Sequence, residues 1–308
     1  MSDFTLPELA NSVVDIVKAI IADIRPRLIE SAVTGKHGEK DNLRHDDNFL
    51  SEFDIRLHKL YRSMLEERLP EFIYASEEAD PEVVGSNPDP DLLVLIDPLD
   101  TSELAVRALQ GYTHIMVYSR KLARPLVAVV GDIFHHVQLY VAARDVGGED
   151  HACIVMAGMD PIPMNVHPLL DVPSALVTNY LMRPLERFLP LATQRRLMER
   201  LSETSGDGKS RGRIGVDFGS ISLCHVAAGF TDATIEFAKG FAVWDLYPGH
   251  YILHAAGGVV IDLTGQAIPL NYRLESPGDV AAAMDRRQKF IAASTPDLAS
   301  DLLHLLDI

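Results

Sequence analysis

The sequence predicts a layered α/β fold, a mixed α+β protein whose two halves share a cleft. Two amphipathic helical patterns come first, a mainly β segment follows, and helices then alternate with strands. The chain has 308 residues and is 47% hydrophobic, which is enough for a sizeable core. We therefore expect one domain over residues 1–308, with an N-terminal α+β half (about 1–150) and a C-terminal α/β half (about 151–308).

The N-terminal half begins with two helical patterns. Apolar residues recur at helical spacing from Val13 to Leu28 and again from Ile55 to Leu65, where the pattern ends before Pro70. The polar, glycine-containing segment Thr34–Asn48 predicts a mobile loop. Apolar and β-branched runs predict strands at 72–75, 92–96, 113–119, 126–130 and 138–142, with turns at 81–91 and 145–151.

The C-terminal half alternates strands with helices. The expected strands are 175–178, 233–237 and 259–262, and the expected helices are 185–201, 220–228 and 246–255. The last helix should stop before Gly257-Gly258. Residues 202–213 are polar and predict a flexible loop. The sequence contains neither an internal repeat nor a low-complexity linker.

The charge balance excludes several classes of protein. Forty-four acidic residues against 28 basic ones give a net charge of −16, which argues against binding a nucleic acid polymer or a membrane surface through bulk charge. Two cysteines cannot form a disulfide framework or a cysteine zinc site. No basic, apolar leader and no run of roughly 20 apolar residues is present. We therefore expect a cytoplasmic protein.

The negative charge is concentrated in one segment. Ten acidic residues and no Lys or Arg lie between Glu71 and Glu103. Asp97 directly follows the expected buried strand, which we expect Pro98 to end, and Asp100 stands three residues further on. Ligands of open α/β sheets gather at such strand ends. Converging carboxylates need a cation, a shared proton or a basic partner, so these two residues indicate either a divalent metal site or a hydrogen-bonded strand cap.

Several further residues could carry chemistry, but a structural role accounts for each of them. Asp245, before an expected helix, is by itself better explained as an N-cap. His250 and His254 have a spacing that zinc proteases use, but Tyr251 stands where the catalytic Glu would be, so we expect helix-surface or interface histidines. Cys224 is expected to be a core residue.

Four segments together resemble a known family. They are Leu50-Ser51-Glu52-Phe53-Asp54, Ser76-Glu77-Glu78, Leu95–Ser102 and Trp244–Gly249, with support from Asp217–Gly229 and Ala255–Gly265. In order and approximate spacing they resemble the inositol monophosphatase family, Mg²⁺-dependent, lithium-sensitive phosphatases related to fructose-1,6-bisphosphatases and bisphosphate nucleotidases. The resemblance covers roughly residues 10 to 300. It implies an α-β-α-β-α sandwich of the sugar phosphatase type and a homodimer.

The resemblance also implies metal ligands. Glu77, Asp97 and the carbonyl of Leu99 would hold a first Mg²⁺, and Asp97, Asp100 and Asp245 a second. Two ions about 4 Å apart can activate water and stabilise the leaving oxygen. A third, looser Mg²⁺ near Glu77 is compatible with the resemblance.

The remaining implied roles concern water and substrate. Ser102 would pair with Asp54 to orient the attacking water, and Glu77 would assist as a catalytic residue. The backbone amides of Thr101 and Ser102 would cradle phosphate. Residues that match positions around the substrate's ring are Gly219, Ser220, Glu236 and, where the family usually has Ala, Tyr247.

Departures from the family pattern surround the substrate. Ser76 and Thr101 replace glycines, Leu104 replaces an Asn, and Tyr247-Pro248 replaces Ala-Ala. If position 101 needs a positive φ, its threonine costs about 1–3 kcal/mol. Two extra residues separate Glu236 from Asp245. Since the metal carboxylates are all present, the resemblance implies a phosphatase acting on a small phosphorylated sugar, polyol or nucleotide. The alternatives are a 3′(2′),5′-bisphosphate nucleotidase, a fructose-1,6-bisphosphatase-like enzyme, or a silent member that only binds a phosphorylated ligand.

Overall fold

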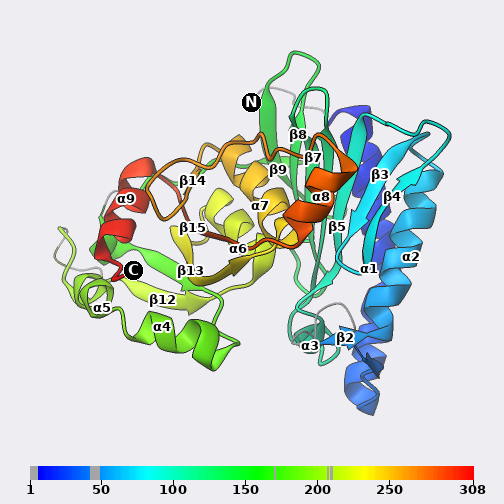
Figure 1. Ribbon diagram of the computed structural model, residues 1–308. Coiled ribbons are helices and arrows are strands. Elements are labelled where there is room, and N and C mark those ends of the chain that lie inside the picture. Colours follow the sequence, from blue (N-terminus) through cyan, green and yellow to red (C-terminus); the bar gives the residue numbers. More distant parts are fainter. Residues whose placement is uncertain (1–5, 42–48, 170, 207, 209–210) are drawn as a thin grey trace. The chain divides into compact units, whose positions relative to one another are not determined.

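A computed structural model describes residues 6–41, 49–169, 171–206, 208 and 211–308 (Figure 1). The chain forms two compact units. Unit 1 comprises Met1–Pro163 and Leu270–Asp285, and unit 2 comprises Met164–Pro269 and Arg286–Ile308. Two predicted loops lie partly outside the described residues, because 42–48 belong to the first loop and 207, 209 and 210 to the second.

Unit 1 is built on an eight-stranded sheet in the order β10-β9-β8-β7-β6-β5-β3-β4. Neighbouring strands are antiparallel except for the parallel pair β3 and β5. The strands are β3 (Phe72–Ser76), β4 (Ala79–Val84), β5 (Leu92–Asp100), β6 (Tyr112–Ser119), β7 (Arg124–Asp132), β8 (Leu139–Arg144), β9 (Asp150–Val155) and β10 (Ile162–Pro163); β1 (Glu39–Lys40) and β2 (Leu50–Ser51) form a separate pair.

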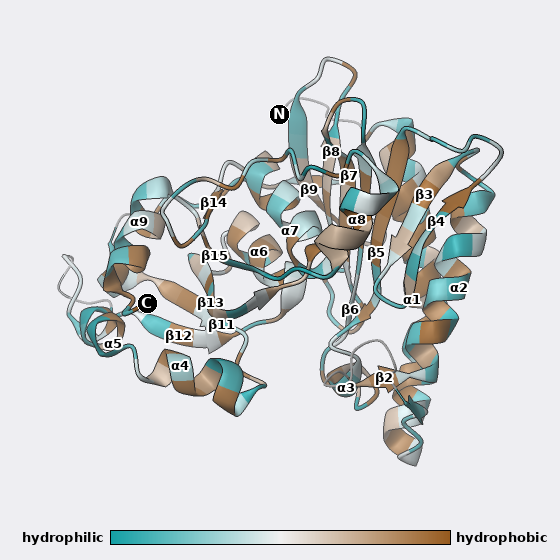
Figure 2. Cartoon of the chain, viewed as in Figure 1, coloured by the Kyte–Doolittle hydropathy of each residue, from teal (hydrophilic) through white to brown (hydrophobic). Residues whose placement is uncertain are grey.

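Helices α1 (Glu8–Thr34) and α2 (Glu52–Glu66) pack against each other and against this sheet. The apolar stripe of α1 is buried in the same core as alternate residues of the strands, including Val94 and Ile96 of β5. Gly131 of β7 leaves room for α1, because a Cβ at this position would lie 2.9 Å from Val17 Cγ1. Figure 2 shows β5 as largely hydrophobic and α2 as a mixture of hydrophobic and hydrophilic turns. These contacts confirm both predicted helices.

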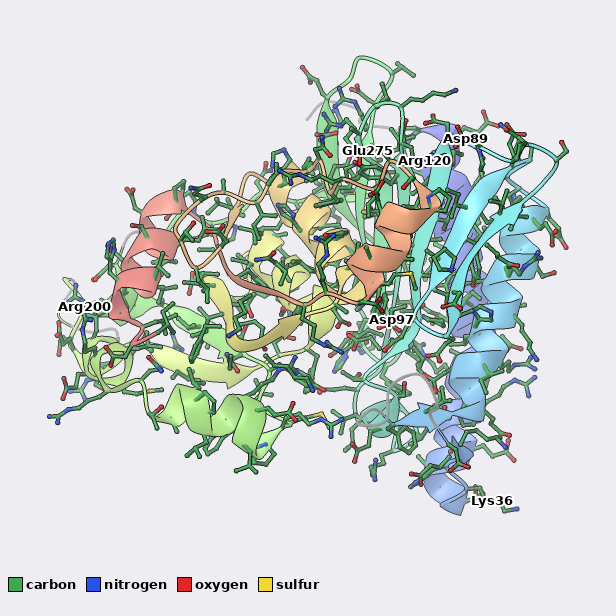
Figure 3. All side chains as sticks on the ribbon, in the orientation of Figure 1. Lys36, Asp89, Asp97, Arg120, Arg200 and Glu275 are labelled. Atoms are coloured by element: carbon green, nitrogen blue, oxygen red, sulfur yellow. The ribbon has the colours of Figure 1, made fainter. Side chains whose placement is uncertain are left out.

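The segment Leu270–Asp285 belongs to unit 1 although it lies far downstream in the sequence. Arg120, at the end of β6, donates through Nε to the carbonyl of Glu275 at 2.8 Å and forms an ion pair with Asp89 at 2.7 Å (Figure 3). The rings of Tyr118 and Tyr272 lie 5.9 Å apart. Helix α8 (Pro277–Met284) contacts β4. Nothing in the sequence pattern indicated this return.

Unit 2 is built on a five-stranded mixed sheet in the order β12-β11-β13-β15-β14. The strands are β11 (Leu176–Asn179), β12 (Arg213–Val216), β13 (Ala233–Phe241), β14 (Val259–Ile261) and β15 (Gln288–Ala293). Helices α6 (Gly219–Ala227) and α7 (Val243–Ala255) pack against each other and contact the sheet, while α9 (Pro296–Leu305) contacts β14 and β15 and helps bury a second core. None of the helices in the described part of the chain is long and apolar enough to span a bilayer.

Strand β5 corrects the prediction that Pro98 ends the strand. The strand continues to Asp100, and its pairing with β6 shifts register between Asp97 and Asp100. Proline has no N–H to donate to a ladder, so it is tolerated where the pairing is irregular. The chain therefore delivers both aspartates from one strand rather than from a strand and a turn.

Two predicted turn regions contain strands. The pattern predicts turns at 81–91, but β4 reaches Val84 and forms a hairpin with β3. It predicts an exposed turn at 145–151, but β9 begins at Asp150. In both cases cross-strand hydrogen bonds extend structure into polar residues.

The predicted helix 185–201 is broken into three pieces, and the loop after it ends earlier than predicted. The pieces are a π-helical turn (Pro184–Phe188), α4 (Leu189–Ala192) and α5 (Arg195–Ser202). Leu185, Phe188 and Leu189 are exposed, so their apolar spacing did not mark a core-facing stripe. Strand β12 begins at Arg213, and the sequence pattern also missed the two elements after residue 285, β15 and α9.

Candidate metal and phosphate site

Three side chains of unit 1 gather where β5 meets β6. Asp97, Asp100 and His114 each offer a ligand atom, and these atoms lie within 4.8 Å of one another. Asp97 is directly opposite His114 in the antiparallel pairing. Alternation along β5 turns Asp97 to the face opposite Val94 and Ile96, which belong to the helix-side core. Figure 3 labels Asp97 at this end of β5.

The two aspartates are held by different partners. The N–H of Leu99 donates to Asp97 Oδ1 at 3.0 Å, so Asp97 also makes the strand-cap contact that was the alternative to a metal site. His114 Nε2 lies 3.3 Å from Asp100 Oδ2, and the His114 side chain is fully buried. Hard divalent cations such as Mg²⁺ prefer oxygen ligands. The two carboxylates therefore fit such an ion, and His114 fits the role of the neighbour that orients Asp100.

Sequence reasoning missed His114. It stands within an apolar strand and carries no motif of its own. The available signal was its polarity in a strand predicted to be buried, since a buried polar residue needs a partner. Only the register of β5 against β6 identifies that partner.

Glu77 follows β3 at the same end of the sheet. Ser76 is paired with Ile96 in the parallel ladder, and the N–H of Glu77 donates to the carbonyl of Ile96 at 3.1 Å. Glu77 directly follows Ser76, and Asp97 directly follows its ladder partner Ile96, so both acids lie at the same level of the sheet. Glu77 is not part of the group within 4.8 Å.

Asp54 is a buried carboxylate in the first turn of α2. It accepts hydrogen bonds from the N–H of Ser51 at 2.7 Å and from the hydroxyl of Ser51 at 2.5 Å. Ser102 Oγ contacts Asp54 Oδ1 and also lies 2.7 Å from the carbonyl oxygen of Leu99. Burial raises the pKa of Asp54 to about 6, although the hydrogen bonds from the two serines lower it. The predicted pairing of Ser102 with Asp54 is present.

Thr101 adopts the left-handed conformation, with φ 59° and ψ 40°. It stands between β5 and the one-turn helix α3 (Ser102–Ala105), and its hydroxyl donates to the carbonyl of Asp100 at 2.6 Å. This meets the condition under which a threonine here stores about 1–3 kcal/mol of strain.

In unit 2, Glu236 carries its own counter-ion. Arg187 Nε lies 2.9 Å from Glu236 Oε2, and both side chains are almost completely buried. Glu236 Oε1 also accepts from the N–H groups of Lys239 and Gly240 at 3.0 and 3.1 Å. The guanidinium of Arg187 lies over the ring of Tyr180 at 4.1 Å. These contacts fix the irregular part of β13 to the π-helical turn.

The prediction that Asp245 is an N-cap is wrong: Ala242 is the N-cap of α7, and Asp245 is the third helical residue, whose carboxylate accepts from the N–H of Ala242 at 3.4 Å. Arg287 lies 3.9 Å away, and burial raises the pKa of Asp245. The hydroxyl of Ser220 donates to the carbonyl of Asp245 at 2.6 Å and accepts from the N–H of Gly249 at 3.1 Å. Ser220 therefore joins α6 to α7.

The other predicted residues of unit 2 have varied surroundings. Gly219, which begins α6, has a φ of 27°, and Tyr247 on α7 has its pKa raised by burial. We expected His250 and His254 to be helix-surface or interface histidines. His254 is exposed, but His250 is buried within this chain, and burial lowers its pKa to about 3. Cys224 is buried, as predicted.

Comparison with known proteins places the chain. Residues 7–300 match the model of the inositol monophosphatase family. The chain is 24% identical over 259 residues to Nus factor SuhB of Pasteurella multocida, covering 84% of this chain and 86% of that protein. It is 33% identical to human inositol monophosphatase 2 over 102 residues, which are 33% of this chain and 28% of that one.

Solved structures agree on the fold. The extragenic suppressor protein SuhB of Bartonella henselae superposes with a TM-score of 0.69 at 18% identity, over 96% of this chain and 98% of that one. A calcium-bound inositol monophosphatase family protein from Staphylococcus aureus gives 0.67 at 18% identity, over 99% and 97%. The protein belongs to the inositol monophosphatase family, and the layered fold that the resemblance implied is confirmed.

Proposed function

We propose that this protein is a divalent-metal-dependent phosphomonoesterase for a small phosphorylated sugar, polyol or nucleotide. The observation that carries the proposal is the group of Asp97, Asp100 and His114 at the end of β5, in a chain of a phosphatase family. Further support comes from the Asp54–Ser102 pair beside that strand end.

We propose Asp97, Asp100, Glu77 and the Leu99 carbonyl as metal ligands in unit 1, with Asp245 as the ligand from unit 2. A Mg²⁺ held by such ligands supplies charge for the phosphate oxygens and lowers the pKa of a water molecule. Two ions, with a third looser one near Glu77, are the number that the resemblance implies. The presence of His114 beside Asp100 supports a fixed orientation for that carboxylate.

Asp54 and Ser102 are proposed to orient the attacking water and accept its proton. The Ser102 hydroxyl has one proton and two acceptors, Asp54 and the Leu99 carbonyl. When Asp54 is ionised, Ser102 can donate to it, which leaves the Leu99 carbonyl for a cation. When Asp54 is protonated, it donates to Ser102, which then donates to Leu99. Ionised Asp54 is thus the competent form.

We propose that the backbone around Thr101 and Ser102 receives the phosphate. We propose that the rest of the substrate is surrounded by Glu236, Gly219 and Tyr247. Ser220 would act indirectly, by holding α7 in place through its hydrogen bonds to Asp245 and Gly249. Since the charge of Glu236 is balanced by Arg187, its carboxylate can accept hydrogen bonds from substrate hydroxyl groups without placing an unpaired charge beside the substrate. A phosphorylated polyol or sugar fits these groups better than an apolar ester does.

A phosphate-release panel tests the proposal directly. Sugar, polyol and nucleotide monophosphates are offered with Mg²⁺ and with EDTA, alongside 3′-phosphoadenosine 5′-phosphate. We expect Mg²⁺-dependent release from one class of monoester. Release only from 3′-phosphoadenosine 5′-phosphate would identify the nucleotidase alternative instead. No release from any compound would favour the silent, ligand-binding alternative.

A second candidate function is that of a Nus factor. Several curated relatives that match most of this chain bear the name Nus factor SuhB. In Escherichia coli cells lacking SuhB, wild-type protein and the Asp97→Asn variant would be compared. If this chain shares that role independently of catalysis, both should restore growth. If neither does, the second function is contradicted.

Three expectations stay predictions. They are a cytoplasmic location, a homodimer, and a small phosphorylated partner without a nucleic acid polymer. Sedimentation equilibrium of the purified protein tests the dimer, whose measured mass should be twice the 34.0 kDa of one chain.

A further inference from the structure

A cavity of about 310 Å³ lies on the helix side of unit 1. Its lining comes from one stretch of α1 and from the beginning of β8: Lys18, Ile21, Ala22, Arg25, Pro26, Gln138 and Leu139. Ile21 and Leu139 belong to the core on that side of the sheet, whereas Asp97 is turned to the opposite face. The cavity is therefore separate from the candidate metal site.

The lining carries positive charge without a balancing acid. Lys18 and Arg25 line the cavity, and no Asp or Glu is among the lining residues. Arg25 donates through Nε to the carbonyl of Ile133, which fixes its guanidinium. Two lining cations without a balancing acid favour an anionic ligand.

The same wall offers a hydrogen-bond acceptor. Pro26 lies inside α1 and has no N–H, so it cannot donate the helical hydrogen bond to the carbonyl of Ala22. Both residues line the cavity. The side-chain amide of Gln138 adds a donor and a second acceptor. Hydroxyl groups of a ligand would satisfy these positions.

We propose that this cavity binds a small phosphorylated polyol. A phosphate dianion balances the charge of the two cations. The cavity has room for several carbon atoms beyond the phosphate. Ile21, Pro26 and Leu139 provide apolar contacts for the carbon chain, and the Ala22 carbonyl and the Gln138 amide bind its hydroxyls.

Isothermal titration of the full-length protein with glycerol 3-phosphate in EDTA tests this site. The chelator removes metal from the candidate catalytic site, and the Asp97→Asn variant provides a second background in which that site is disabled. We expect one binding event, equal in both proteins, and none with glycerol alone. Equal binding of glycerol, loss of binding in Asp97→Asn, or no binding to wild type would each overturn the proposal.

Variants localise the binding event. Arg25→Met should weaken binding at least about tenfold, because it removes the charged donor. Ala22→Trp should do the same by filling the cavity while keeping both cations. Arg27→Met is the matched control, since Arg27 lies on the same helix, is half exposed and pairs with Asp23. Thermal melts check folding; if Arg25→Met is unfolded, Ala22→Trp and Lys18→Met decide. Binding in these variants equal to that of Arg27→Met would contradict the assignment.

Discussion

The acidic residues of the two units are neutralised in different ways. In unit 1, the contacts described for Asp54 and Asp100 come from serines and a histidine. In unit 2, Glu236 faces Arg187 at 2.9 Å, and Asp245 has Arg287 at 3.9 Å. Carboxylates held by hydroxyl groups retain negative charge for an added cation, whereas a carboxylate beside a guanidinium is already balanced. The difference favours unit 1 as the part of the molecule where an added cation would be held.

The largest effect should follow from removing charge in unit 1. Asp97→Asn is expected to reduce phosphate release at least about a thousandfold, because it removes the proposed bridging charge. Turnover is measured with saturating Mg²⁺. Asp89→Asn is the control, since Asp89 is an exposed acid of the same segment that pairs with Arg120. Near-normal turnover by Asp97→Asn would exclude the two-metal proposal.

In unit 2, removing the partner of a buried carboxylate should lower the free energy of unfolding. Arg187→Met leaves buried Glu236 without its counter-ion, which typically costs about 3–5 kcal/mol. Chemical denaturation measures the loss. Lys239→Met, which breaks the more exposed pair with Glu186, should cost less than about 1 kcal/mol. Adding Glu236→Gln to Arg187→Met should restore much of the stability. If the double variant is no more stable than the single one, the pair is not what holds this region.

Asp54 should set an acidic limb in the pH profile. Its folded pKa of about 6 is above the ordinary 3.8, so protonation of the native protein removes the competent carboxylate below about pH 6. The sign for stability is opposite: the stabilisation is complete below pH 3.8 and is lost as the pH rises through 6. The pH dependence of kcat/KM measures the limb.

Ser102→Ala sharpens this assignment. The hydrogen bond from Ser102 lowers the pKa of Asp54. When this bond is lost, the acidic limb in the pH profile of the remaining activity should move to higher pH. Asp54→Asn should lower the rate far more than Mg²⁺ affinity. An unmoved limb in Ser102→Ala, or equal losses of rate and Mg²⁺ affinity in Asp54→Asn, would contradict the roles assigned to this pair.

The smallest effect should come from relieving strain at Thr101. Thr101→Gly removes a β-branched side chain from φ 59° and should raise stability by about 1–2 kcal/mol. Ala108→Gly, at φ 52°, is the control for a positive φ without a branched side chain, and should gain less. Urea midpoints compare the two. A loss of stability in Thr101→Gly would mean that its hydroxyl contact with Asp100 outweighs the strain.

The sequence predicted well where one local rule dominates. The apolar stripes of α1 and α2 and the aliphatic run of β5 reflect burial of whole faces, and their elements were found. It failed where pairing with a distant segment decides the outcome. Strand β9 and the extension of β5 past Pro98 depend on neighbouring strands. The helix predicted at 185–201 failed because the apolar residues at its start, Leu185, Phe188 and Leu189, are exposed.

The candidate site divides in the same way. The sequence pattern indicated Asp97 and Asp100, because carboxylates that gather at a strand end without a basic neighbour favour a cation, and the family resemblance added Asp54 and Ser102. Tertiary structure alone joined His114 to Asp100, gave Glu236 its partner Arg187, and returned residues 270–285 to unit 1. Strand register and ion pairing join residues that are far apart in the chain, so they cannot be predicted from the local sequence pattern. The sequence determined which groups are candidates for the chemistry, and folding decided which of them hold one another in place.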